Sequence, residues 1–346
     1  MKFGTGILTD DCNAVDARKI RRLAKEVIEL RDRGVEIIIV SSGAVGAGMG
    51  ALGQRKRPRK LADLQACAAV GQSRIMAMYD RYFGGAGVTT AQVLLTHEDL
   101  RHKDRHINAR NTLVSLLQKG VIPIVNENDA VSFTELRFGD NDRLSALVAS
   151  LIPVDCLVIL TTAPGVIENF GTRGERVLPT IERIDDRIRA MAQGTRRATA
   201  TGGMSTKIEA ATIALRSGIP TVIASGEVKG NLPGIMSGRD IGTLILPRPK
   251  KLTGRKRWIA FFHKPKGRLL VDKGAGEALR LHGKSLLLAG IVNVQGQVKE
   301  GEVVSVVDAD GREIARGIAS MGGTAIRDGN VKKGEAVIHR DNLVVL

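Results

Sequence analysis

The chain alternates continuous apolar runs with helical patterns, and this alternation restricts its fold more than any other feature. The apolar runs lie at 35–43, 87–96, 121–129, 156–162 and 219–226. They are apolar throughout, as in strands that are covered on both faces. Helical patterns occur at 15–33, 59–82, 107–119, 142–152 and 205–217. This order predicts an α/β fold, a three-layer αβα sandwich with a mainly parallel central sheet.

The pattern changes near residue 247. The segment "PRPKKLTGRKR" at 247–257 combines Pro, Gly and charge, which is typical of a linker. Beyond it, short apolar runs alternate with Gly turns, and "DADG" at 308–311 predicts a β-hairpin. We therefore expect a first domain over residues 1–250, a linker over 251–263 and a small all-β barrel over 264–346.

The bulk properties favour a soluble cytoplasmic protein without a membrane-spanning segment. No apolar run reaches the roughly 18 residues of a membrane span, and the first residues lack the pattern of a signal peptide. Cys12, Cys67 and Cys156 have no paired spacing, so neither a disulfide framework nor a zinc site is indicated. The formal net charge of +16 is spread over short bursts, and only 3% of residues are aromatic. This pattern favours an anionic ligand more than it favours RNA.

Ligands of parallel sheets bind at the carboxyl ends of the strands, so the segments near predicted strand ends are the candidate sites. The glycines of "SSGAVGAGMG" at 41–50 do not match the spacing of dinucleotide-binding loops. The segment "ATGGMSTKIEAA" at 200–211 combines glycines, hydroxyls and Lys207 before a helix. It is either a phosphate-binding loop or a flexible loop with a helix cap.

The segment "FGDNDRLSA" at 138–146 also allows two interpretations. Asp140, Asn141 and Asp142 suit the start of a helix, where acids and caps are favoured. The same carboxylates would suit a metal–phosphate site. His102 and His106 are four residues apart, but so charged a segment is more typical of a solvated helix face than of a metal site. "HGKSLLL" at 282–288 is interpreted as a chance match to a phosphate loop, because it leads into a strand pattern.

Seven short motifs occur in a fixed order along the first domain: "KFGTG" (2–6), "VSSGAVGAG" (40–48), "AAVGQSR" (68–74), "NARNTL" (108–113), "PIVNENDAV" (123–131), "FGDNDRLSA" (138–146) and "TGGMSTK" (201–207). Together they resemble the amino acid kinase superfamily, and within it the kinases that phosphorylate glutamate. The carboxyl-terminal segments, from "KRWIAF" to "HRDNLVVL", resemble a PUA domain.

This resemblance implies phosphorylation of the γ-carboxylate of L-glutamate by ATP with Mg²⁺, giving glutamyl 5-phosphate for proline biosynthesis. It implies that Lys2 and Lys207 neutralise the transferred phosphoryl group and that Asp142 orients both lysines. The implied glutamate-binding residues are Ser42, Gly43, Asn126, Asp129 and Asn141. Gly4 would allow the backbone to approach the phosphates. The implied nucleotide-binding residues are Lys2, Thr161, Thr162, Thr201, Gly202, Gly203, Met204, Ser205, Thr206 and Lys207.

The resemblance also carries expectations about partners. It implies proline as a feedback inhibitor, a homo-oligomer (dimer or tetramer) and RNA binding by the PUA domain. Thr162 stands where the family usually has Asp, Ala200 where it has Gly, and the family has several strand residues ahead of the lysine at position 2. Two alternatives stay open: a related kinase for aspartate, acetylglutamate or carbamate, and an RNA-binding protein with a degenerate kinase domain.

Overall fold

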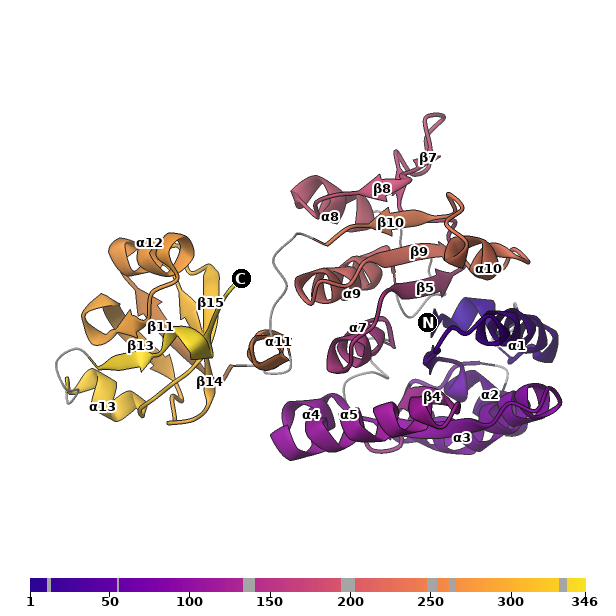
Figure 1. Cartoon of the computed structure of the whole chain (residues 1–346). Coiled ribbons are helices and arrows are strands. Elements are labelled where there is room, and N and C mark those ends of the chain that lie inside the picture. Colours follow the sequence, from indigo (N-terminus) through magenta and orange to yellow (C-terminus); the bar gives the residue numbers. More distant parts are fainter. Residues whose placement is uncertain are drawn as a thin grey trace. The chain divides into compact units, whose positions relative to one another are not determined.

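The computed structural model describes residues 1–10, 14–54, 56–132, 141–193, 203–247, 254–261, 265–329 and 335–346. The chain divides into two compact units, Met1–Lys251 and Leu252–Leu346 (Figure 1). No helix in these ranges is both long and apolar enough to cross a membrane.

The first unit is built on an eight-stranded sheet with the strand order β3-β4-β2-β1-β5-β9-β10-β8. Every neighbouring pair from β3 to β9 is parallel, β10 is antiparallel to β9, and β8 is parallel to β10. The mainly parallel sheet is therefore confirmed. The strands are β1 (Lys2–Phe3), β2 (Ile39–Ser41), β3 (Thr90–Leu95), β4 (Ile122–Glu127), β5 (Leu157–Thr161), β8 (Thr180–Ile181), β9 (Thr221–Ser225) and β10 (Thr243–Ile245).

Helices cover both faces of this sheet, which confirms the three-layer αβα sandwich. One layer contains α1 (Ala17–Asp32), α3 (Leu61–Gly84) and α10 (Asn231–Met236), and the other contains α7 (Asn141–Leu151), α8 (Asp186–Gln193) and α9 (Met204–Arg216). Figure 1 shows α1 and α10 on one side of the sheet and α7 and α9 on the other. The first unit also contains η1 (Thr5–Ile7), α2 (Ala44–Ala51), α4 (His97–Arg101), α5 (Lys103–Gln118) and the separate pair β6 (Ile167–Glu168) and β7 (Arg176–Val177).

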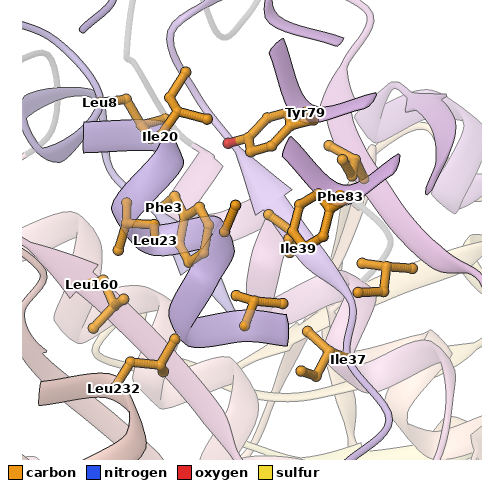
Figure 2. Close-up of a cluster of buried hydrophobic side chains, with 14 of the residues drawn as sticks. Phe3, Leu8, Ile20, Leu23, Ile37, Ile39, Tyr79, Phe83, Leu160 and Leu232 are labelled. Atoms are coloured by element: carbon orange, nitrogen blue, oxygen red, sulfur yellow. The ribbon is translucent and has the colours of Figure 1, made fainter. Parts of the chain in front are cut away.

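A large apolar cluster fixes the central strand β1 between its helices. Phe3 of β1 packs with Ile20 and Leu23 of α1 and with Tyr79 and Phe83 of α3, and all five side chains are fully buried (Figure 2). Burying one such side chain contributes about 1.5–3 kcal/mol. Because Lys2 immediately precedes Phe3, this packing also fixes the backbone that carries the lysine.

Helices α2 and α3 touch through their backbones because both carry glycine at the contact. A Cβ on Gly48 would lie 1.8 Å from the carbonyl oxygen of Cys67, and one on Gly71 would lie 1.7 Å from that of Ala44. Neither position therefore accepts a side chain without separating the two helices. The Gly-rich stretch after β2 thus forms a helix that packs closely against α3.

The second unit contains a five-stranded sheet with the order β13-β11-β14-β15-β17 and a two-stranded pair of β12 and β16. All its strand pairs are antiparallel except β11 and β14. The strands are β11 (Gly267–Val271), β12 (Leu286–Leu287), β13 (Ile291–Gly296), β14 (Val303–Val307), β15 (Glu313–Ile318), β16 (Ala336–Ile338) and β17 (Leu343–Val345). The expected small β domain is present.

The second unit also contains helices, which the all-β expectation omitted: α11 (Gly254–Phe261), α12 (Lys273–His282) and α13 (Gly323–Arg327), with the short turns η2 (Leu288–Gly290) and η3 (Arg340–Asn342). Helix α11 lies within 251–263, the segment interpreted as a linker. It packs against β15 and β17 and buries Ile259, Ala260 and Phe261. This apolar end explains why a segment rich in Pro, Gly and charge continues into a helix.

Candidate active site

The candidate site lies where the parallel strands β1, β2, β4 and β5 end. The register pairs Phe3 with both Ser41 and Leu160, so the carboxyl ends of β1, β2 and β5 lie level with one another. Lys2 belongs to β1, Ser42 and Gly43 follow β2, and Asp129 follows β4. These segments therefore lie together at the carboxyl ends of the strands, where the sequence analysis placed the candidate sites.

Two lysines share one carboxylate at this edge. Lys2 Nζ lies 2.6 Å from Asp142 Oδ1, and Lys207 Nζ lies 3.0 Å from Asp142 Oδ2. Thr206 Oγ1 also donates to Asp142 Oδ2, at 2.7 Å. The three charged residues come from β1, α7 and α9, and none is more than 5% exposed. The trio therefore concentrates one net positive charge in a place largely shielded from water.

The lysines keep Asp142 ionised. Burial by itself raises the pKa of the Asp142 carboxyl, but Lys2 and then Lys207 hold that pKa well below its usual range. Buried ions are costly unless they are paired and hydrogen-bonded, and here both oxygens of the carboxylate have partners. The arrangement is thus suited to binding an additional anion beside the two ammonium groups.

Asn141, the first residue of α7, links this trio to the neighbouring strands. Its Nδ2 donates to the carbonyl oxygen of Ser41 at 2.9 Å, to Ser42 Oγ at 3.1 Å and to Asn126 Oδ1 at 3.0 Å. The Asn141 Oδ1 atom is buried and accepts no hydrogen bond from the part of the chain that the structure describes. A buried acceptor of this kind calls for a donor from a ligand.

Next to this network lies a pocket of about 250 Å³ with an acidic wall. Glu127 and Asp129 both line it; Glu127 Oε1 accepts from Ser132 Oγ at 2.7 Å, and His97 Nδ1 lies 3.3 Å from Glu127 Oε2. Burial, followed by the charge of Glu127, raises the pKa of Asp129 to about 7, against the opposing effect of Arg57. The full lining is Ala44, Ala68, Ala69, Gln72, Ser73, Gln92, Leu94, Glu127, Asn128, Asp129 and Ala130.

Two glycines keep the backbone close to this edge. Gly43 is the N-cap of α2 and has a φ of 100°, a left-handed conformation that favours glycine. A Cβ on Gly4 would lie 3.1 Å from the carbonyl oxygen of Leu160 and 3.5 Å from Lys2 Nζ. A side chain at Gly4 would therefore press against the Leu160 carbonyl and contact the lysine.

The expected nucleotide-binding residues lie on two segments. Gly203 is the N-cap of α9, and Thr206 Oγ1 donates to its carbonyl oxygen at 2.9 Å. Ser205 is half-buried. The Met204 side chain is buried in the apolar cluster of α7 and α9, so Met204 can contact a ligand only through its backbone. Thr161 ends β5 and the exposed Thr162 follows it. Thr201, Gly202 and Asp140 lie outside the residues that the structure describes.

Two residues near the site were missed by the sequence analysis, Gln72 and Glu127. Gln72 Oε1 accepts a hydrogen bond from Asn126 Nδ2 at 2.8 Å. Both residues occur within motifs already singled out, "AAVGQSR" and "PIVNENDAV", and this was the signal that could have found them. Their contacts join residues far apart in the chain, so spacing alone did not reveal them.

Comparisons with known proteins agree with this geometry. The amino acid kinase family model matches residues 1–225, and the PUA domain model matches residues 267–340. A solved structure with a similar fold is carbamate kinase from Giardia lamblia bound to AMP-PNP, with a TM-score of 0.51 and 20% identity. The match covers 71% of this chain and 97% of that one, and at this identity it supports the fold alone.

The parallel sheet, the lysine pair at its edge and the family match together define the class: the chain belongs to the amino acid kinase family. Curated relatives include the glutamate 5-kinases of Moorella thermoacetica and Geobacter sulfurreducens, each 44% identical over 360 residues. These matches cover 100% of this chain and 95% and 96% of the two relatives. Within the family, the chain therefore groups with the glutamate 5-kinases.

Proposed function

We propose that this chain transfers the γ-phosphoryl group of ATP to the γ-carboxylate of L-glutamate, giving ADP and glutamyl 5-phosphate, the first step of proline biosynthesis. The observation that carries this proposal is the buried trio of Lys2, Asp142 and Lys207 beside an acid-lined pocket. Full-length similarity to glutamate 5-kinases supports the choice of substrate.

In this proposal the two ammonium groups stabilise the charge of the phosphoryl group during its transfer. Phosphoryl transfer needs positioning and charge stabilisation more than a covalent nucleophile. Asp142 fixes the Nζ atoms of Lys2 and Lys207 through contacts of 2.6 and 3.0 Å. It is therefore assigned an orienting role, and the glutamate γ-carboxylate is the attacking group.

Glutamate is assigned to the pocket side of the site. An ionised Asp129 suits the α-ammonium group, while Ser42, Asn126 and Asn141 supply neutral polar groups. Gly43, at the start of α2, leaves the backbone accessible to a carboxylate. ATP is assigned to the α9 side, with Thr161, Thr162 and the segment from Thr201 to Lys207 as its binding residues.

Magnesium is assigned to the nucleotide rather than to a protein cage. Among the described residues no group of three or more His, Cys, Asp or Glu side chains is arranged to hold a metal ion. Both oxygens of Asp142 are already engaged by lysines and Thr206. With the Asp142 oxygens engaged in this way, we expect Mg²⁺ to be bound mainly by the ATP phosphates, as it commonly is. The ion would further neutralise the charge of these phosphates.

The remaining partners of this proposal follow from the resemblance to the family. We assign proline as a feedback inhibitor, a homo-oligomeric state (dimer or tetramer) and a cytoplasmic location. The match to the PUA domain supports RNA as a partner of the second unit. Such binding would weaken steeply with added salt, because it would release counterions from the phosphates.

The test is ADP release by the purified protein with ATP, Mg²⁺ and one acceptor at a time. Glutamate is expected to support turnover and to yield a hydroxamate when hydroxylamine is present, because an acyl phosphate forms. Aspartate, acetylglutamate and carbamate serve as the competing acceptors. Equal turnover with aspartate would contradict the substrate assignment, and tight RNA binding without any glutamate-dependent turnover would favour the RNA-binding alternative.

A further inference from the structure

Gln72 of α3 is the polar side chain that connects the pocket to the lysine site. It lines the pocket of about 250 Å³. Its Oε1 accepts from Asn126 Nδ2 at 2.8 Å, and Asn126 Oδ1 accepts from Asn141 Nδ2 at 3.0 Å. Asn141 precedes Asp142, so three amides form a continuous path from the pocket to the lysine pair.

This chain of hydrogen bonds fixes which end of Gln72 is available to a ligand. Asn126 is only 2% exposed, and its oxygen is committed to Asn141. Its nitrogen must therefore face Gln72, and Gln72 must present its oxygen to Asn126. Within the described chain no hydrogen bond uses Gln72 Nε2, so this donor is left for the pocket.

In contrast to the N–H donor of Gln72, the charged groups of the pocket lining are carboxylates, which accept hydrogen bonds. Glu127 and Asp129 line it, whereas the described lining residues include no Lys or Arg. Asp129 Oδ1 is buried and accepts no hydrogen bond from the described residues. A pocket with a carboxylate and a separate neutral N–H donor matches the head of an α-amino acid, which carries an ammonium and a carboxylate on one carbon.

We propose that Gln72 is a specificity-determining residue that donates a hydrogen bond from Nε2 to the α-carboxylate of the substrate, while Asp129 faces its α-ammonium group. This inference rests on the proposed function, because it takes the acceptor to be glutamate. Asn126 acts through Gln72 in this scheme: it turns the Gln72 donor toward the pocket.

The substitution Gln72→Glu tests the donor directly. It retains an oxygen that accepts from Asn126 but replaces the N–H donor with a second acceptor that repels a carboxylate. At pH 8.5, kcat/KM for glutamate is expected to fall at least about tenfold, the size of one hydrogen bond to a charged group. The α-amide of glutamate, isoglutamine, is expected to lose less, because its amide can donate to the new carboxylate.

The decisive measurement is the ratio of kcat/KM for glutamate to kcat/KM for isoglutamine. This ratio is expected to fall at least about tenfold in Gln72→Glu. Gln118→Glu makes the same chemical change on an exposed residue at the end of α5, outside the pocket lining, and should leave the ratio nearly unchanged. KM for ATP is expected to stay constant in both variants.

A purely structural role of Gln72 predicts a different result. If Gln72 only supports Asn126, Gln72→Met should lower both kcat/KM values equally, and Gln72→Glu should resemble the wild type. An unchanged ratio in a folded variant, checked by thermal unfolding, overturns the inference. Absence of glutamate-dependent turnover in the wild type would instead reject the proposed function, so the two failures are distinguishable.

Discussion

Lys207 can be removed without leaving Asp142 unpaired, because Lys2 still contacts Oδ1. In Lys207→Ala we expect kcat to fall about 10²–10³-fold, since one of the groups that stabilise the phosphoryl charge is lost. The thermal unfolding temperature should change little. Lys119→Ala, which removes an exposed lysine at the end of α5, is the control and should keep wild-type kcat. Wild-type kcat in Lys207→Ala would contradict the assigned role.

The raised pKa of the Asp129 carboxyl leads us to expect that glutamate binding depends on pH. Burial and Glu127 raise its pKa to about 7, so the carboxylate is mostly protonated at pH 6 and mostly ionised at pH 8. Because the ionised form attracts an ammonium group, kcat/KM for glutamate should rise with pH and level off above about pH 7. A profile measured from pH 5.5 to 9 checks this, and Asp129→Asn should abolish that rise. An identical profile in the variant would assign the titration to another group.

At the scale of residues, the sequence alone left Asn141 and Asp142 ambiguous. Asp and Asn residues suit both the start of a helix and a charged site. In the structure the two residues have both roles, because they begin α7 and contact Ser41 of β2 and Lys2 of β1. Only the resemblance to a family grouped them with Lys2 and Lys207. The hydrogen bond between Gln72 and Asn126 joins residues 54 apart, and no local pattern encodes such a pair.

At the scale of elements, the contact between α2 and α3 depends on glycine. Gly71→Ala places a Cβ against the backbone of α2, which cannot move aside as a side chain could. We expect a loss of about 1–3 kcal/mol in the free energy of unfolding, and a higher KM for glutamate, because Ala44 and Gln72 on these helices line the pocket. Urea unfolding and steady-state kinetics measure the two effects.

Gly50→Ala, in the neighbouring helix α2, is the matched control. A Cβ at Gly50 meets nothing within 4 Å, and alanine favours a helix by about 1 kcal/mol over glycine. This variant should be as stable as the wild type or slightly more stable, with unchanged KM. If Gly71→Ala behaved in the same way, the helices would not be held at backbone contact.

Strands were predicted well because their apolar runs are continuous and bounded by Gly and polar residues. Each of the five observed strands β2, β3, β4, β5 and β9 lies inside its expected range. Helix α2 could not be recognised as a helix from "SSGAVGAGMG", since glycine and alanine give no amphipathic pattern. Strand β1 is only two residues long and gives no periodic signal of its own.

At the scale of the molecule, every described residue of the candidate site lies within Met1–Lys251. A chain that ends at residue 247 should therefore fold and keep kcat and both KM values within the same order of magnitude as the full chain. Coupled ADP release on the two proteins measures this. Lys207→Ala in the shortened chain controls for contaminating kinases. A shortened chain that is folded but inactive would show that the second unit contributes to the site.

The pairing of β1 has a consequence for the order of events during synthesis. Strand β1 lies between β2 and β5, and Lys2 pairs with Ile159, so its place in the sheet is complete only when residues near 160 are available. Asp142 and Lys207 are likewise encoded far downstream of Lys2. On the ribosome, the beginning of this chain must therefore wait for most of the first unit to emerge, and nascent chains stalled before Lys207 should be catalytically silent.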